Sequence, residues 1–335
     1  MSNLNLNENS ANSKTVVLNN LYNEIIQNED VTNQTVMVDK FVNLIEEHGI
    51  DSIMNLNLKE KIITSLSNKP NFSTKQGIIL ICQKLQTKLK EKFEPYLFSF
   101  IELLIDLLDD NKTINQMMNT FLTEFGNNMN PYATIIILPI LFKKLKEFSW
   151  KIKVGCLSLI SVIAQNATTQ IGNLLPMIVP QITEYFWDTK FEVKQAAKEA
   201  LTACCNNISN PDVKPIIPIL ISANGNPKET NSAIDRLMGT TFVSQVDKQT
   251  LSIIVPLMNR GLRDRDVQVN RKCCVVIDNM CKLVCSESDV EPFVDKLLPQ
   301  LTRVAEEVPI PEIREYGERA KETLLKAINN SEINK

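Results

Sequence analysis

The chain of 335 residues has little glycine and few aromatic residues: it holds 9 glycines, and Phe, Trp and Tyr together make up 6% of it. Sheet proteins use glycine in tight turns and aromatic residues in strands, so this composition argues against an all-β or α/β fold. No stretch of useful length alternates apolar and polar residues as a strand would. The apolar content of 44% is nevertheless ordinary for a folded protein. We therefore predict an all-α protein.

Long apolar runs are also missing, since the longest covers only residues 133–142, whereas a membrane-spanning helix needs about 20 such residues. The N-terminus has no basic region followed by an apolar segment, so it does not resemble a secretory signal. Residues 1–14 are polar and rich in Asn, which predicts a disordered tail, and residues 329–335 are expected to be flexible. Eight cysteines without a signal peptide favour the reducing cytoplasm.

The side chains and motifs of common enzymes are scarce or absent. The chain contains one histidine, His48, and none of the phosphate-loop, G-x-S-x-G, H-E-x-x-H or G-x-G-x-x-G motifs. No C-x-x-C pair occurs, and the only dense cysteine group lies within residues 273–285. We expect these cysteines to pack between helices; a zinc site or a redox sensor is the alternative. The sequence therefore predicts a protein that is not an enzyme and has no cofactor.

Prolines inside apolar helical patterns recur along the chain at a regular interval. They are Pro139, Pro180, Pro218, Pro256 and Pro299, which are 41, 38, 38 and 43 residues apart. The interval is close to the period of HEAT-type helical hairpins, about 40–47 residues. Because proline removes a backbone donor, each of them is expected to bend the first helix of a hairpin.

A second pattern marks the partner helix of each hairpin. Val193, Val269 and Ile313 each begin a stripe of apolar or small residues with helical spacing, which predicts one buried face. We predict an α-solenoid of HEAT-type hairpins over residues 15–328, with three or four helices before residue 89. The predicted hairpins cover residues 93–127, 131–166, 168–207, 210–243, 246–285 and 287–328.

Cations concentrate in the turns between the first and second helices. The candidates for partner binding are Lys143, Lys144, Lys146, Trp150, Lys151, Lys153, Lys190, Lys194, Arg260, Arg263, Arg265, Arg271 and Lys272. Equivalent turns of stacked hairpins share an edge, so Lys151, Lys190 and Arg265 are expected to contribute to one basic ridge that favours phosphate. Alternatively, these charges solvate the turns and pair with neighbouring acids. Trp150 and Trp187 could stack on a base or anchor their turns.

Several segments resemble the N-terminal HEAT domain of translation elongation factor 3. They are "FSWKIKVGCLSLI" (148–160), "EYFWDTKFEVKQAAKEAL" (184–201), "TTFVSQVDKQTLSIIVPLMNRGLRDRD" (240–266) and "VVIDNMCKLV" (275–284). The similarity covers residues 71–325. "VPIPEIREYGERAKETL" (308–324) fits the related scaffold that activates the general-control kinase about as well. The string "IDNMCKLV" favours the elongation factor.

The resemblance implies a non-catalytic module that binds the ribosome, through ribosomal RNA and proteins, in translation elongation or its regulation. The ATP-binding cassettes of the factor have no counterpart here, so the resemblance carries over no nucleotide hydrolysis. A protein scaffold that binds an ATP-binding-cassette protein or the general-control kinase machinery is a second hypothesis. A tubulin-binding HEAT domain is a third, because such domains also present Trp and Lys in their turns. No membrane or small-molecule partner is expected.

Overall fold

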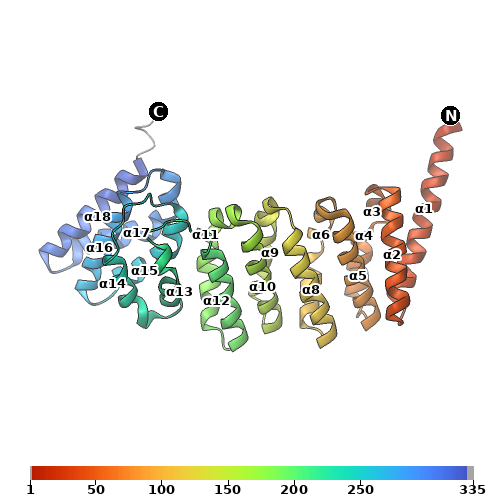
Figure 1. Cartoon of the computed structure of the whole chain (residues 1–335), viewed down its shortest axis with the longest axis horizontal. Coiled ribbons are helices and arrows are strands. Elements are labelled where there is room, and N and C mark those ends of the chain that lie inside the picture. Colours follow the sequence, from red (N-terminus) through yellow and green to blue (C-terminus); the bar gives the residue numbers. More distant parts are fainter. Residues whose placement is uncertain (1, 330–335) are drawn as a thin grey trace. The chain divides into compact units, whose positions relative to one another are not determined.

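A computed structural model of the protein describes the backbone of residues 2–329 and the side chains of residues 14–329. Over these residues the chain forms 18 α-helices and no strand. It divides into two compact units, Met1–Asn166 and Ala167–Lys335. The prediction of an all-α solenoid of helical hairpins is confirmed (Figure 1).

The N-terminal unit stacks its helices in sequence order. Its α-helices are α1 (Ser2–Gln27), α2 (Val31–His48), α3 (Asp51–Asn55), α4 (Leu58–Ser67), α5 (Phe72–Leu89), α6 (Glu94–Phe98), α7 (Ile101–Asp106), α8 (Lys112–Asn128), α9 (Thr134–Leu145) and α10 (Trp150–Asn166). Short 3-10 turns are η1 (Lys90–Lys92), η2 (Leu107–Asp109) and η3 (Pro131–Ala133). Helix α5 packs against α2 and α8, and α8 packs in turn against α10. These four helices form one continuous layer of the unit.

The C-terminal unit repeats this plan. Its α-helices are α11 (Thr168–Thr183), α12 (Phe191–Cys205), α13 (Ile217–Gly225), α14 (Thr230–Met238), α15 (Lys248–Leu262), α16 (Val267–Cys281), α17 (Glu287–Glu307) and α18 (Pro311–Asn329). Its 3-10 turns are η4 (Glu184–Trp187), η5 (Lys214–Ile216) and η6 (Pro227–Glu229). Helix α15 packs against α13 and α17, and α16 packs against α14 and α18. First and second helices therefore form two layers.

The six predicted hairpins all contain helices, and the predicted buried stripes are confirmed. Val193, Val269 and Ile313 are at most 4% exposed, and the small residues that follow them on α12, α16 and α18 are buried as well. Burying each large apolar side chain contributes roughly 1.5–3 kcal/mol, which explains why the 3.6-residue pattern locates these helices. The small residues permit close helix approach: a Cβ added at Gly261 would lie 2.5 Å from the sulfur of Cys273.

The structure differs from the prediction at the N-terminal end. Five helices, not three or four, occupy the segment up to Leu89, because the region between α2 and α5 contains two short helices, α3 and α4. Helix α1 also begins at Ser2, within the segment predicted as a disordered tail; residues 1–14 contain neither proline nor glycine to interrupt a helix. The predicted flexible terminus at 329–335 lies outside the described residues apart from Asn329, which ends α18.

All five recurring prolines lie in helices, and four of them lie in a helix interior. Pro139, Pro180, Pro256 and Pro299 lie inside α9, α11, α15 and α17. Pro218 instead lies in the first turn of α13, where the missing N–H would have no helical acceptor. The expected bend therefore does not apply to Pro218.

Candidate basic interaction surface

Three lysines in or beside the α9–α10 turn bind groups of the preceding repeat. Lys143 Nζ lies 2.6 Å from Glu102 Oε2, and Lys144 Nζ lies 2.5 Å from Asp106 Oδ1. Lys151 Nζ donates to the carbonyl oxygen of Asp110 at 2.9 Å. These partners precede the lysines by 41, 38 and 41 residues. The separation matches the sequence repeat, so these lysines link one repeat to the next.

Lys144 is the most deeply embedded of the candidate cations. It is 6% exposed, and its ammonium also lies 3.4 Å from Glu147 Oε1. Burial lowers the pKa of Lys144, but the hydrogen bonds and charges of Asp106 and Glu147 outweigh it, so the pKa is raised above its ordinary value. Lys144 therefore acts within the fold and presents little surface to a partner.

The remaining candidates of the N-terminal unit differ in their exposure. Lys146 is exposed and its side chain pairs with none of the side chains that the structure describes. Lys153 is half-buried and already takes part in an interaction. Trp150, the first residue of α10, is 38% exposed and lines a small groove with Lys112 and Lys151. Phe148, which sequence analysis did not select, is fully exposed beside it.

Around the α15–α16 turn of the C-terminal unit, too, some cations are engaged inside the fold and others are exposed. Arg260 donates to the carbonyl oxygens of Ala223 and Asn224 and to Thr230 Oγ1, at 2.8–3.1 Å. Burial lowers the pKa of Arg260. Because its guanidinium holds α15 against the α13–α14 region, Arg260 is a structural residue and not a free ligand for a partner.

Arg271 and Lys272 are also engaged. The guanidinium of Arg271 lies 4.5 Å from the ring centre of Tyr316, donates to its hydroxyl at 3.0 Å, and approaches Glu312 at 3.7 Å. Lys272 Nζ forms an ion pair with Asp235 Oδ1 at 2.6 Å. Both residues therefore connect α16 to its neighbours, Arg271 to α18 and Lys272 to α14.

Four candidates of the C-terminal unit remain exposed and unpaired. Lys190 and Lys194 lie at the start of α12, and Arg263 and Arg265 lie in the α15–α16 turn. Within residues 14–329 none of their side chains makes an ion pair or a hydrogen bond. Asp264 and Asp266 alternate with the two arginines, but each accepts a backbone N–H within the turn. These four cations can therefore bind an anion without first breaking a bond inside the protein.

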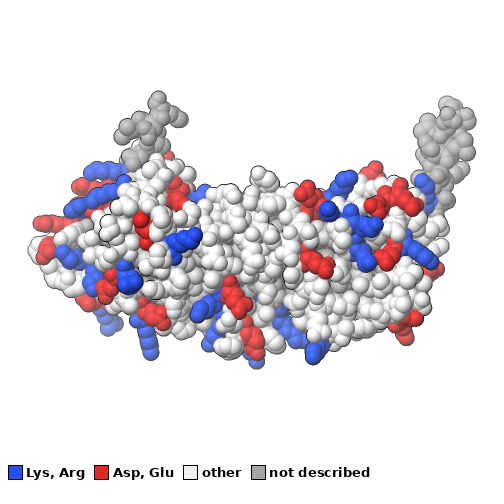
Figure 2. Space-filling view, viewed as in Figure 1, with Lys and Arg blue, Asp and Glu red and all other residues white. Residues whose placement is uncertain are grey.

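Basic and acidic side chains are interspersed on the visible face of each unit. Figure 2 shows blue and red groups side by side over α2–α6, and a similar mixture over the C-terminal helices. The acids that pair with Lys143, Lys144 and Lys272 account for part of this mixture. A continuous basic ridge through Lys151, Lys190 and Arg265 stays a prediction, because Lys151 belongs to one unit and the other two residues to the next.

Comparison with protein families gives two matches that together cover most of the chain. Residues 34–201 match the EF3 N-terminal HEAT repeat, and residues 229–335 match the Elongation factor 3/GNC1 HEAT repeat. The first match alone covers half of the chain. The chain belongs to the elongation factor 3 HEAT-repeat family. The resemblance inferred from the sequence is confirmed.

Individual family members show the same relationship. The chain is 36% identical over 285 residues to Elongation factor 3 of Phytophthora infestans, a match that covers 84% of this chain and 28% of that protein. It is 39% identical over 238 residues to Elongation factor 3 of Candida albicans, covering 70% of this chain and 23% of the relative. The chain thus spans about a quarter of the length of these curated relatives.

Two exposed residues of α12 and one of η5 were missed by the sequence analysis. Phe191 is 74% exposed at the first position of α12, and Lys198 and Lys214 are exposed beside a shallow groove. The spacing of Lys194 and Lys198 is a signal visible in the sequence, because residues four apart lie on one helix face. Phe191 gave no such signal, since an aromatic residue at a helix start is ordinarily taken as core.

The cysteines of this family member are structural in the described region. Seven are buried and only Cys285 is exposed. Burial raises the pKa of Cys156 and of Cys205 to about 12, so their thiols stay protonated. The part of the chain from Lys14 to Asn329 contains no cluster of three or more His, Cys, Asp or Glu residues suited to a metal ion.

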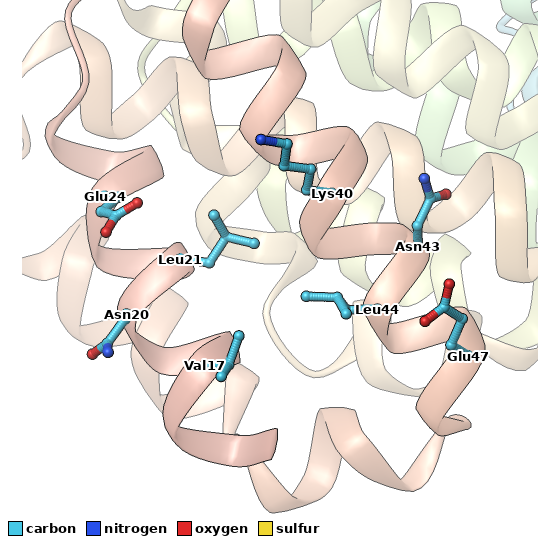
Figure 3. A pocket seen from close by; sticks show the side chains of 8 residues that line it. All are labelled: Val17, Asn20, Leu21, Glu24, Lys40, Asn43, Leu44 and Glu47. Atoms are coloured by element: carbon cyan, nitrogen blue, oxygen red, sulfur yellow. The ribbon is translucent and has the colours of Figure 1, made fainter. Parts of the chain in front are cut away.

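A separate groove of about 540 Å³ lies between α1 and α2 in the N-terminal unit. Figure 3 shows Leu21 and Leu44 pointing toward one another from the two helices, and Val17 lies beside them. Asn20, Asn43, Lys40, Glu24 and Glu47 surround this apolar floor. Both signs of charge are present, so the groove has no preference for an anion.

Every helix within residues 2–329 is too short or too polar to cross a bilayer.

Proposed function

We propose that this chain is a cytoplasmic binding module for the ribosome that acts in translation elongation or its regulation. Membership in the elongation factor 3 HEAT-repeat family supports this proposal, as do relatives that carry the name Elongation factor 3. The proposed binding mode rests on one observation: some turn cations are unpaired, and others are engaged inside the fold. Lys190, Lys194, Arg263 and Arg265 are exposed and unpaired among the described residues, whereas their neighbours hold the repeats together.

The physical basis is the release of counterions from phosphate. A cation without an internal partner binds a phosphate at little cost, and each such contact displaces counterions from ribosomal RNA. A cation that is already paired, such as Lys272, must first give up its carboxylate. The unpaired cations are therefore expected to account for most of the salt dependence of ribosome binding, and ribosomal proteins contribute the remaining contacts.

We also propose that the chain by itself is not catalytic. The chain has one histidine and none of the common catalytic motifs, and from Lys14 to Asn329 no cluster of His, Cys, Asp or Glu suits a metal ion. Purified chain is therefore expected to hydrolyse no ATP or GTP, with or without ribosomes. Turnover above the rate of a mock preparation would contradict this part of the proposal.

Co-sedimentation with ribosomes over a range of salt concentrations tests the binding mode. The two reversal variants are Lys190→Glu/Lys194→Glu and Arg263→Glu/Arg265→Glu. Because all four side chains are exposed, and acidic residues suit the N-terminus of α12, these variants are expected to fold. We expect each to bind several-fold more weakly and to lower the slope of log K against log salt by about one unit per cation.

The matched control is Arg236→Glu/Lys296→Glu, which changes the charge equally at two exposed positions of α14 and α17 in the same unit. It should bind nearly as the natural chain does. Equal losses in all three variants would mean that net charge alone matters, which would overturn the assignment to these turns. A protein partner that stays bound at high salt after nuclease treatment would favour the general-control scaffold. The match of residues 229–335 to the Elongation factor 3/GNC1 HEAT repeat also supports this alternative.

A further inference from the structure

Helix α12 carries a row of lysines along one side. Lys190 is its N-cap, and Lys194 and Lys198 follow at intervals of four residues. All three side chains are exposed and none forms an ion pair with the residues that the structure describes. Residues four apart lie one above the other on a helix, so the row extends over about 12 Å at 1.5 Å per residue. This length suits the backbone of an extended polymer better than a single anion.

The acids of α12 lie on a different side of the helix. At about 100° per residue, Lys194 and Lys198 point roughly 40° apart, whereas Glu192 and Glu199 lie about 100–160° from them. Glu199 also accepts a hydrogen bond from Gln195 at 2.7 Å. The lysine side of α12 is therefore free of the helix's own acids, and among the described residues the neighbouring acid whose pKa is lowered by side-chain hydrogen bonds and by Lys198 is Glu229, on η6.

Two aromatic side chains flank the N-terminal end of this lysine row. Trp187, which ends η4, is 61% exposed, and Phe191, which begins α12, is 74% exposed. Neither ring stacks on another aromatic ring or on a cation among the described side chains. Exposing two large rings in one turn is unfavourable in water, and their apolar faces are available to a planar partner.

A groove of about 320 Å³ continues the row at the other end, between α12 and α13. Lys198 and Lys214 lie at its edge, and Thr202 and Asn206 supply a hydroxyl and an amide. Its apolar floor is formed by Ile208, Ile217, Pro218 and Ile221. The groove thus combines cations, hydrogen-bonding groups and an apolar surface of the size that one base or sugar covers.

We propose that the lysine side of α12, with Trp187 and Phe191 at one end and the α12–α13 groove at the other, binds single-stranded RNA. The lysines contact successive phosphates, and the two rings stack on unpaired bases. Single-strand binding surfaces combine these two elements, a basic track and exposed aromatic faces. The proposal deepens the proposed function, on which it rests for the choice of RNA as the partner.

An acidic peptide is the main competitor for the lysines, but it would leave the two rings without a role. A double helix would also satisfy the lysines, yet its bases are already stacked and could not cover Trp187 or Phe191. The aromatic pair therefore decides between these partners. Experiments on Trp187 and Phe191 distinguish single-stranded RNA from the other two polymers.

The test is fluorescence anisotropy of a labelled ten-nucleotide oligouridylate with the full chain at low salt. Trp187→Ala/Phe191→Ala should weaken binding about 10-fold or more, since stacking contributes about 5- to 140-fold per base. Lys194→Gln/Lys198→Gln should weaken it and lower the salt slope by about 1.4. The matched controls are Phe148→Ala, an exposed aromatic of the other unit, and Arg236→Gln/Lys296→Gln; both should bind normally.

Intrinsic fluorescence gives a second readout, because the chain has only two tryptophans. In a Trp150→Phe variant the remaining emission comes from Trp187, and oligouridylate should quench it with the same midpoint as the anisotropy. Absence of quenching, or binding unaffected by Trp187→Ala/Phe191→Ala, would overturn the proposal. So would equal binding of decaglutamate or of an RNA duplex.

The outcomes also separate this inference from the proposed function. If ribosomes bind through the turn cations but the oligouridylate does not bind, the single-strand surface is wrong and the ribosome module stands. If the oligouridylate binds as described but ribosomes do not, the surface stands and the proposed cellular partner is wrong. The variants are compared by circular dichroism first, and the four substituted target side chains are exposed, so misfolding can be recognised as a separate effect.

Discussion

Replacing Lys144 by Met should destabilise the N-terminal unit, although the substitution removes only one charge. Lys144 is 6% exposed and binds Asp106 Oδ1 at 2.5 Å and Glu147 Oε1 at 3.4 Å. Methionine fills much of the same apolar volume but leaves both carboxylates without their cation. The decrease in the free energy of unfolding therefore reports how strongly Lys144 stabilises the contact between the end of α9 and the end of α7.

The expected size follows from how far the two carboxylates are exposed. Removing one partner of a fully buried pair costs about 3–5 kcal/mol. The side chains of Asp106 and Glu147 are 43% and 45% exposed, so water can solvate them once the lysine is gone. We therefore expect the free energy of unfolding to decrease by about 1–2 kcal/mol. For a cooperative unit of this size, that corresponds to a decrease in Tm of about 2–8 °C.

Thermal unfolding followed by circular dichroism at 222 nm measures this change, and hydrogen exchange of α9 and α10 locates it. Lys146→Met is the matched control, because Lys146 lies in the same turn without a partner among the described residues. In a double-mutant cycle, the variant that combines Lys144→Met and Asp106→Asn should lose less free energy of unfolding than the two single variants lose in sum. Equal Tm values for the Lys144 and Lys146 variants, or strictly additive losses, would refute the reasoning.

Three further predictions concern packing, cysteine chemistry and pH. Gly225→Ala should lower the Tm, because the added Cβ would overlap the ring of Phe186, and Phe186→Leu in the same chain should restore part of the loss; a neutral Gly225→Ala would show that the ring moves freely. In the folded chain one thiol, that of Cys285, should react rapidly with Ellman's reagent and the others only on unfolding, since they are buried; several rapid thiols would contradict this. Desolvation raises the pKa of Asp110, but hydrogen bonds and charge from Lys75 and the Asn111 backbone outweigh it, so the pKa is lowered from 3.8. The ionised carboxylate of Asp110 stabilises the fold above its ordinary pKa of 3.8, and this stabilisation is lost as the pH falls through the lower folded-state pKa. Asp110→Asn should therefore reduce the acid sensitivity of unfolding, and an unchanged acid transition would contradict the assignment.

The helical periodicity predicted most of the fold because it reports directly on burial. The stripes that start at Val193, Val269 and Ile313 are buried in the structure, and helices occur in all six predicted hairpins. The N-terminal region was harder to divide, because α3 and α4 are too short for a clear 3.6-residue pattern. Pro218 looked like the other repeat prolines in sequence but lies in the first turn of its helix, which only its backbone position reveals.

The candidate surface was less predictable, because a cation's role depends on an acid one repeat away. Lys143 and Lys272 look as available as Lys190 in the sequence, yet Glu102 and Asp235 neutralise them from 41 and 37 residues upstream. Once the repeat period is known, searching one period away for a carboxylate would have identified these pairs. The hydrogen bonds of Arg260 to backbone carbonyls could not be found in this way, because every residue carries a carbonyl.

Lysine footprinting of the chain on ribosomes tests the central claim, that the unpaired turn cations contact the partner. Amine labelling at low salt, read by mass spectrometry, compares Lys190 and Lys194 with Lys59 and Lys296, which are exposed and unpaired within the described residues but lie in α4 and α17. Ribosomes should reduce labelling of Lys190 and Lys194 several-fold and leave Lys59 and Lys296 unchanged. Bound chain in which all four lysines remain equally reactive would contradict the claim.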